Sequence, residues 1–270
     1  MIGLHRELAP LSEKAWRVVE QEAREVLGLH LAARRLMDFD GPHGWGHSAV
    51  DLGGVLALED ASPSALVRRR RIRPLIELRV PFELERAELE RVDRGARDAD
   101  LGALRDAARQ FAAAEDHALF EGRPDADLPG LLSGASQRPV RLPADGARIP
   151  DAVAAALGQL RRAGVAGPYA LALGPLPFET LESTVEGGYP VLRHVQTLID
   201  GPAIWAPTLT GGLVASLRGG DFRMVCGRDA SLGYLSHDAS RVRLYLEESF
   251  SAELTGPECV VPLRAFEGDS

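Results

Sequence analysis

The chain has 270 residues, of which 45% are hydrophobic and 26% are charged. This composition is typical of a globular protein with a sizeable core, and it excludes a disordered chain. The formal net charge of −8 argues against a general affinity for nucleic acid or anionic membranes. No apolar run approaches the roughly 18 to 20 residues that span a bilayer, and the first residues lack the pattern of a secretory signal. We therefore expect a soluble cytoplasmic protein with neither nucleic acid nor membrane as a partner.

The first expected helix begins after Ser12 and runs to about Met37. Apolar residues recur at helical spacing from Trp16 to Leu31, which places one apolar stripe on an otherwise charged helix. Ser12 is the expected N-cap, and Leu11 with Trp16 fits a hydrophobic staple. The glycine-rich and proline-rich run DFDGPHGWG then ends the helix.

Residues 50–84 change to short extended pieces, VLALED and RIRPLIELRVPFEL, separated by the turn-like DASPS. This pattern predicts a long two-stranded excursion. Because a two-stranded ribbon is marginally stable alone in water, we expect it to pack on another chain or on a distant part of its own. Its basic run at 68–73, RRRRIR, suits phosphate contacts or ion pairs between subunits, and the acidic total charge favours ion pairs.

Residues 86–121 are expected to be helical again, with a break near Gly95 and a cap at Asp100. The apolar face of the second of these helices consists of Leu104, Ala108, Phe111 and Leu119.

Three consecutive residues of this second helix, Glu115, Asp116 and His117, invite interpretation as a metal site. Consecutive helical residues point in three directions, whereas metal ligands on one helix face need a spacing of three or four. We therefore expect a charged patch that faces solvent or another subunit, and no metal.

The stretch at 130–150, GLLSGASQRPVRLPADGARIP, is rich in glycine, proline and serine and predicts a domain boundary. Beyond it, helices and strands alternate as far as LVASL, which favours a compact α/β unit. The last third is extended again. There Val242, Leu244 and Leu246 alternate with Arg241, Arg243 and Tyr245, as in a half-buried strand.

The consecutive residues Ser236, His237 and Asp238 are the residue types of a hydrolase triad, but their adjacency argues against a catalytic triad. Neighbouring residues on a strand point to opposite faces, and catalytic triads are assembled from residues far apart in sequence. No G-x-S-x-G, CxxC or HExxH pattern occurs. We expect SHDAS to form a turn and the chain to have no catalytic residue.

The remaining candidate ligands stand alone in the sequence. Cys226 and Cys259 lie in apolar settings, which predicts core packing instead of a disulfide or a metal site. Four isolated histidines are expected to serve in packing or at the surface, and these are His30, His43, His47 and His194.

Several stretches, in order along the chain, resemble the linocin-like family of encapsulin shell proteins. They include LAPLSEKAW, AARRLMDFDGPHGWG, PLIELRVPFEL, AAAEDHALFEG, GPYALALG, RGGDF, SLGYLSHD and VRLYLEESF, and they cover the chain to about Phe250. The resemblance implies an α+β protein with the HK97 phage-capsid-like fold. It implies a peripheral domain with the N-terminal helix, an extended loop and an axial domain. The corresponding ranges are 1–49, 82–132 and 222–270 for the peripheral domain, 50–81 for the loop and 133–221 for the axial domain.

The same resemblance implies a function. Such proteins self-assemble into closed icosahedral shells, here expected to be of the T=1 kind, and enclose a cargo enzyme through its C-terminal targeting peptide. The cargo is a dye-decolourising peroxidase or a ferritin-like protein. Some relatives bind a flavin against a tryptophan, but the matching position here is Ala87, and we expect no cofactor.

The resemblance also implies two sites. The cargo-peptide groove would be lined by Leu31, Arg34, Asp38, Leu232, Gly233 and Tyr234. Alternatively, Leu31 and Leu232 simply close the core. The loop around the fivefold pore would contain Gly187, Gly188 and Tyr189.

Two other functions stay open at this point. One is an HK97-fold viral or prophage capsid protein that packages DNA, and the other is a hydrolase that uses Ser236.

Overall fold

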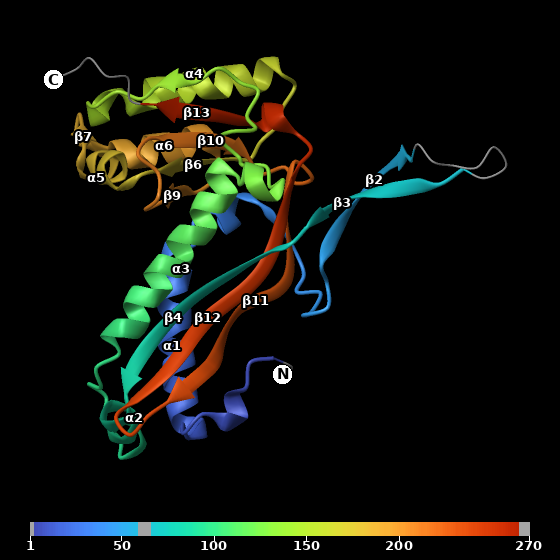
Figure 1. Ribbon diagram of the computed structural model, residues 1–270. Coiled ribbons are helices and arrows are strands. Elements are labelled where there is room, and N and C mark those ends of the chain that lie inside the picture. The colour runs from blue at the N-terminus through green and yellow to red at the C-terminus, as the bar shows by residue number, and fades with distance from the viewer. Residues whose placement is uncertain (1–2, 59–65, 265–270) are drawn as a thin grey trace.

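The computed structural model describes residues 3–58 and 66–264. Figure 1 shows a tall lower part, an upper part at the far end of helix α3, and a two-stranded arm that reaches away from both. Each of these three segments follows from a different pattern in the sequence.

The lower part is built on a four-stranded sheet with the order β1-β11-β12-β4. Its strands are β1 (Asp38–Asp40), β4 (Ile76–Glu85), β11 (Phe222–His237) and β12 (Arg241–Leu254). β12 pairs antiparallel with both β11 and β4, and β1 runs parallel to β11. The two longest strands are therefore neighbours in the sequence and form one long hairpin.

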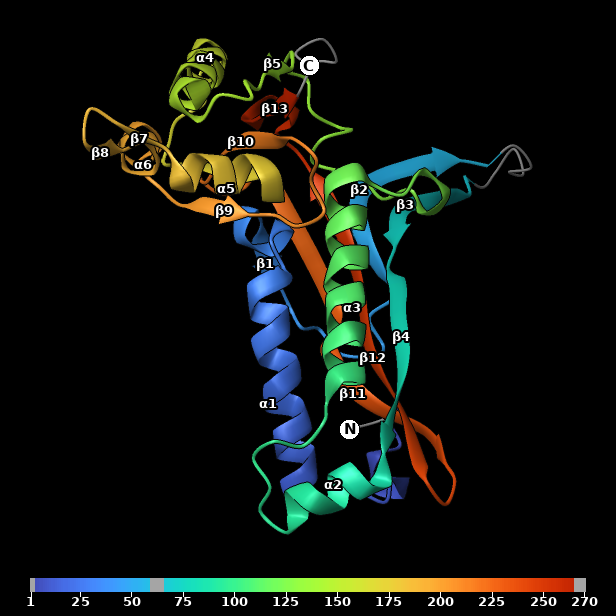
Figure 2. The ribbon, with the colours of Figure 1, turned by 90° about the vertical axis from the view of Figure 1, so that its left-hand side faces the viewer.

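Three helices belong to the lower part: α1 (Glu13–His30), α2 (Arg86–Asp93) and α3 (Gly102–Glu121). Figure 2 shows α1 and α3 standing side by side. Trp16 and Val19 of α1 and Phe111 of α3 join apolar residues of the sheet in one core. This is the apolar stripe that the sequence predicts.

The start of α1 is confirmed, but its predicted end is wrong. The Ser12 hydroxyl accepts the Ala15 backbone N–H at 3.0 Å, as an N-cap does. The α-helix stops at His30 instead of Met37, and a short 3-10 helix follows. The cause lies far away in the sequence, because the Asp116 carboxylate accepts the N–H groups of Ala32 and Ala33 at 2.9 to 3.1 Å. These two groups are therefore not available to continue the α-helix.

The start of α3 differs slightly from the prediction. The helix begins at Gly102 after Leu101, and the Asp100 carboxylate accepts the Gly102 N–H at 2.9 Å. The break at Gly95 is confirmed, since α2 ends before this residue and its φ of 104° is left-handed.

The upper part contains a five-stranded sheet with the order β5-β13-β10-β6-β9. Its strands are β5 (Val140–Arg141), β6 (Tyr169–Leu173), β9 (Ala203–Trp205), β10 (Gly212–Ser216) and β13 (Val260–Arg264). Its helices are α4 (Ile149–Arg162), α5 (Pro175–Ser183) and α6 (Val191–Ile199), and a small hairpin is formed by β7 (Val185–Glu186) and β8 (Tyr189–Pro190). This mixture matches the predicted α/β unit.

The sequence-based division assigned all of 222–270 to the peripheral domain, but part of this segment lies in the upper part. β13 lies inside the upper sheet, antiparallel to β10 and parallel to β5. Its residues Val260, Val261 and Leu263 are buried there. Both cysteines are also buried, as predicted.

The arm consists of β2 (Ala49–Ala57) and β3 (Arg68–Pro74), paired antiparallel. The extended loop was expected to span 50–81. The observed arm ends earlier, because residues from Ile76 onward pair with β12 in the lower sheet. Arg68 to Arg71 are exposed, together with Val55 and Leu56 of the facing strand.

Four short 3-10 helices lie outside these elements, and a fifth follows α1. They are Arg6–Leu8, Ala33–Leu36, Pro124–Ala126, Gly146–Arg148 and Pro257–Cys259. Over the described ranges 3–58 and 66–264, no helix is long and apolar enough to cross a membrane.

Candidate functional site

A groove of about 390 Å³ lies between helix α1 and strand β11. Its apolar walls come from α1 and from the sheet, and they consist of Ala23, Leu27, Leu31, Leu232 and Leu246. The α1 residues belong to the stripe predicted from the sequence, and the sheet residues Leu232 and Leu246 are directly paired across β11 and β12. The groove therefore forms where two amphipathic elements meet without closing completely.

The two leucines expected in this groove do line it. Leu232 is only 4% exposed and belongs to the lower core, whereas Leu31 is half-buried and packs against the same core from its edge. Both residues therefore have a packing role and also present apolar surface to the groove.

Charged residues surround the apolar walls. The Arg6 guanidinium lies 2.5 Å from the Glu20 carboxylate and stacks over the Trp16 ring at 4.1 Å. Arg24 is exposed, and its guanidinium lies 3.4 Å from the Gln21 side-chain oxygen. An apolar floor inside a charged rim is the arrangement that captures short peptide segments.

Arg34 also reaches the groove, but its guanidinium is engaged in a buried ion network. It donates to Glu115 at 2.6 and 2.8 Å, to Asp229 at 2.7 Å and to Glu248 at 2.6 Å. The side chains of Glu115 and Glu248 are fully buried, and only Asp229 is substantially exposed, at 45%. The sequence places Arg34 at the rim as a peptide contact, whereas its donors already have partners within the chain.

Burial and neighbouring charges shift the pKa values of Arg34, of Glu248 and of the adjacent Asp116. Burial raises the pKa of Glu248 well above its ordinary value, and repulsion from Glu115 adds to the effect. Burial alone would lower the pKa of Arg34, but its bond to Glu115 and the other carboxylates raise it above the ordinary value, so Arg34 stays charged. Burial also raises the pKa of Asp116 to about 7, although its bonds from Ala33 and Ala32 act in the opposite direction.

The sequence predicts that Glu115, Asp116 and His117 form a charged patch facing solvent or another subunit. This prediction is wrong for two of the three residues. Glu115 and Asp116 are completely buried, while His117 is exposed. The reason is that Arg34 and the backbone of residues 32 and 33 supply partners from a distant segment. Among the described residues, no three side chains of the metal-binding types come together to hold an ion.

Asp38 does not line the groove. It lies on β1, where its carboxylate accepts the Gly220 N–H at 2.6 Å, and it borders a separate pocket of about 240 Å³ together with Phe222. The structure thus does not bring Asp38 and Arg34 together as a polar rim.

Gly233 and Tyr234 do not line the groove either. A Cβ at Gly233 would lie 2.1 Å from the Tyr245 ring, so the ring requires glycine at this position. The Tyr234 N–H donates to the Leu4 carbonyl at 2.9 Å, and its hydroxyl bonds to His237 Nδ1 at 2.6 Å. Tyr245 lies on the face opposite Leu244 and Leu246, as the alternation predicts, but it is buried there against Gly233 and Arg79.

Sequence reasoning missed several residues of the groove. These are Arg6, Glu20, Ala23, Arg24, Leu27, Gly28, Asp229, Ala230, Ser231 and Leu246. On α1, Glu20, Arg24 and Gly28 follow one another at intervals of four residues beside the apolar stripe, so the stripe itself indicates which charged residues stand next to the groove.

The three residues expected at a pore form the tip of the hairpin between β7 and β8. Gly187 and Gly188 have φ values of 55° and 81°, which a two-residue hairpin turn requires and glycine adopts readily. Tyr189 is 57% exposed. Figure 2 shows this hairpin at the outer end of the upper part.

The residues Ser236, His237 and Asp238 make separate contacts. Ser236 and His237 extend strand β11 and pair with Arg243 and Val242, so the expected turn contains only Asp238 to Ser240. The Asp238 carboxylate accepts the N–H groups of Ser240 and Arg241. This arrangement does not form the hydrogen-bonded chain of a catalytic triad.

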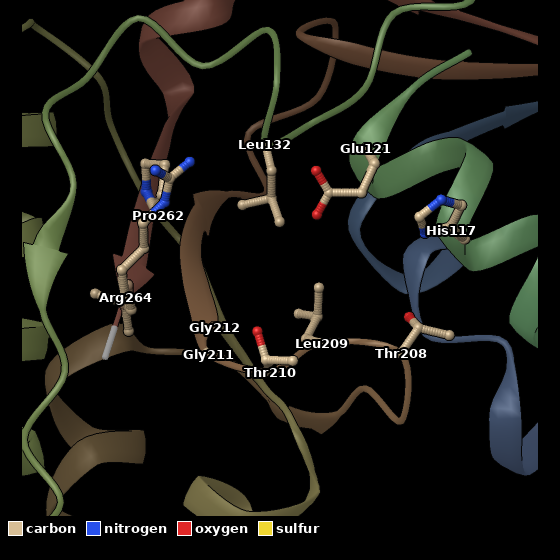
Figure 3. Close-up of a pocket in the computed structure, with 11 residues that line it drawn as sticks. His117, Glu121, Leu132, Thr208, Leu209, Thr210, Gly211, Gly212, Pro262 and Arg264 are labelled. Carbon is tan, nitrogen blue, oxygen red and sulfur yellow. The ribbon is translucent and has the colours of Figure 1, made fainter. Parts of the chain in front are cut away.

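A larger cavity of about 660 Å³ lies where α3 meets the upper part. Figure 3 shows His117 and Glu121 on the helix, with Thr208 and Thr210 on the loop between β9 and β10. Arg264 of β13 lies on another wall. The cavity thus belongs to the junction between the two parts.

Comparison with solved structures defines the fold class. A virus-like particle from Pyrococcus furiosus matches with a TM-score of 0.66 at 15% identity, over 92% of this chain and 99% of that chain. The capsid of Myoviridae phage XM1 matches with a TM-score of 0.54 at 11% identity, over 86% and 90%. Likenesses at this identity show the fold alone, and it is the HK97-like capsid fold that the sequence predicts.

Sequence comparison then gives the family. The family model described as "Encapsulating protein for peroxidase", Linocin_M18, matches residues 1–251. The type 1 encapsulin shell protein of Rhodospirillum rubrum is 49% identical, over 98% of this chain and 97% of that protein. The type 1 encapsulin shell protein of Mycobacterium tuberculosis is 39% identical, over 93% and 95%. The chain belongs to this family of structural shell proteins.

Proposed function

We propose that this protein is the self-assembling subunit of an encapsulin nanocompartment in the cytoplasm. The subunits form a closed icosahedral shell of the T=1 kind, and the shell encloses a cargo enzyme. The C-terminal targeting peptide of the cargo binds in the groove between α1 and β11. The groove is the observation that carries the binding step, because it combines an apolar floor with a charged rim.

The arm supports the assembly step. β2 and β3 pair only with each other in the described chain, and they carry exposed apolar residues beside the exposed arginines 68–71. An isolated ribbon of this kind gains stability when a neighbouring subunit covers it. Closed point-group symmetry supplies such a neighbour to every subunit. The HK97-like fold and the names of the relatives point in the same direction.

A peroxidase is the first candidate for the cargo, because the family description names one. A ferritin-like protein is the second. The shell itself is expected to have no catalytic activity, and the separate contacts of Ser236, His237 and Asp238 support this.

The hairpin at residues 187–189 is proposed to border the fivefold pore. It lies at the outer end of the upper part, and two of its three residues are glycines, which leave an aperture open. In this arrangement the exposed Tyr189 side chain would stand close to the pore.

The direct test is to purify particles from cells that carry this gene and identify their contents by mass spectrometry. A peroxidase or ferritin-like protein in fixed proportion to the shell supports the proposal. Removing the last residues of that cargo should abolish its enclosure while empty shells still form. A stable monomer at micromolar concentration in analytical ultracentrifugation would contradict the assembly step.

The same particles separate this proposal from a DNA-packaging capsid. Such a capsid shares the fold, but the whole-chain relatives at 39% identity and above are shell proteins, and the net charge of −8 disfavours nucleic acid. Nuclease-resistant DNA inside purified particles would favour the capsid function.

A further inference from the structure

Gly28 occupies an unusual place in helix α1. The helix continues beyond it to His30, and Leu31 is the C-cap residue, so Gly28 is not the glycine that ends a helix. Gly28 is also absent from the residues with a left-handed φ. Neither helix termination nor backbone conformation requires a glycine at this position.

Packing within the chain does not require it either. Apart from its two chain neighbours and the backbone of its own helix, a Cβ at Gly28 would meet no described atom within 4 Å, in contrast to Gly233, where the Tyr245 ring occupies that space. A glycine inside a helix costs about 1 kcal/mol relative to alanine. The fold therefore carries this cost without a steric reason of its own.

The position of Gly28 suggests what the open space serves. Gly28 lines the groove on the α1 side, next to Leu27 and Leu31, and Leu232 lies on the β11 side. The missing side chain makes a notch in the helix wall, and apolar side chains border that notch. The charged residues Arg6 and Glu20 pair with each other at the rim.

We propose that Gly28 is a specificity-determining residue of the groove, because its notch accepts one large apolar side chain of the bound segment. This inference rests on the proposed function, in which the groove binds the C-terminal segment of a cargo protein. It adds that the absence of a side chain at residue 28 sets the size of the side chain that fits against α1. A side chain at residue 28 would fill the notch and change which segments bind.

The test uses a fluorescent protein that ends in a flexible linker and a tail of random sequence. The library is expressed together with wild-type shells or with Gly28→Ala or Gly28→Leu shells, and the tails enclosed in purified particles are sequenced. Wild-type shells should enrich tails with a large apolar residue at one position. Gly28→Leu should reduce enrichment of those tails about tenfold and favour alanine or glycine there, with an intermediate shift for Gly28→Ala.

Two controls separate the possible failures. Gly158→Ala changes a glycine inside helix α4, where the nearest atom to a new Cβ is the movable end of Arg162 at 3.2 Å, and it should leave the enriched tails unchanged. Leu31→Asp should abolish enrichment altogether. If Gly28→Leu shells enrich the same tails as wild-type shells while Leu31→Asp shells enrich none, the groove stands and the role of Gly28 is refuted. If wild-type shells enrich no tails, the proposed groove fails and the role of Gly28 fails with it.

Discussion

Replacing Arg34 with methionine is expected to destabilise the protein far more than it weakens any peptide contact. Methionine keeps much of the packing of the arginine stem but leaves Glu115 and Glu248, both fully buried, without their counter-charge. Removing one partner of a buried ion pair costs about 3 to 5 kcal/mol. At roughly 2 to 4 °C per kcal/mol for domains of 150 to 250 residues, the melting temperature should fall by about 10 °C.

The measurement is thermal unfolding of purified shells by differential scanning calorimetry. Arg24→Met is the matched control, because Arg24 is exposed on the neighbouring helix and lines the same groove. Loss of an exposed charge should cost less than about 1 kcal/mol. A triple variant, Arg34→Met with Glu115→Leu and Glu248→Leu, should recover much of the lost stability, since replacing a whole buried ion cluster with hydrophobic residues of similar volume is often neutral.

One result would refute this reasoning. If Arg34→Met shells keep the wild-type melting temperature and lose enclosed cargo, then Arg34 acts mainly on the peptide, as the sequence-based hypothesis stated. If the single variant does not yield soluble protein, the triple variant decides, because its recovery would still attribute the loss to unpaired buried carboxylates.

Leu31→Ala should lower the amount of enclosed cargo per shell about tenfold, whereas Asp38→Asn should not change it, because only Leu31 lines the groove; equal loss in both variants, measured by fluorescence of an enclosed reporter, would contradict this. Asp116 has a pKa raised to about 7 by burial, so the stability it contributes is complete below about pH 4 and is lost as the pH rises through about 7. Asp116→Asn should therefore reduce the fall in the free energy of unfolding between pH 5 and pH 8 by an amount on the order of 2 kcal/mol, and an unchanged pH dependence of unfolding would show that another group is responsible. Gly233→Ala should destabilise the lower part by roughly 1 to 3 kcal/mol, because the new methyl group would overlap the Tyr245 ring; a melting temperature equal to that of the wild type would disprove the close contact.

Local patterns were sufficient for the elements that local interactions determine. The cap at Ser12, the apolar stripe from Trp16 and the break at Gly95 all depend on residues within a few positions of each other. Here the sequence patterns and the observed structure agree, because capping, amphipathicity and glycine conformation act over one or two helical turns.

Distant contacts account for the errors. Asp116 ends helix α1 from a position 83 or 84 residues away, and Arg34 makes Glu115 a buried residue. Gly233 follows Leu232 directly and therefore belongs to the opposite face of the strand. Tyr234 shares a face with Leu232 but packs against the lower core outside the groove. A register contact with Tyr245 then decides the role of Gly233. No periodicity along the chain contains this information.

The place of β13 in the upper sheet couples the two parts of the protein during synthesis. β13 follows every other strand and helix of the described chain, yet it lies between β5 and β10 inside that sheet. The five residues of β13 leave the ribosome only after β11 and β12, which belong to the lower sheet. The upper part therefore cannot finish folding as a separate N-terminal unit before the lower part is made. A nascent chain that stops before Val260 lacks an interior strand of the upper sheet.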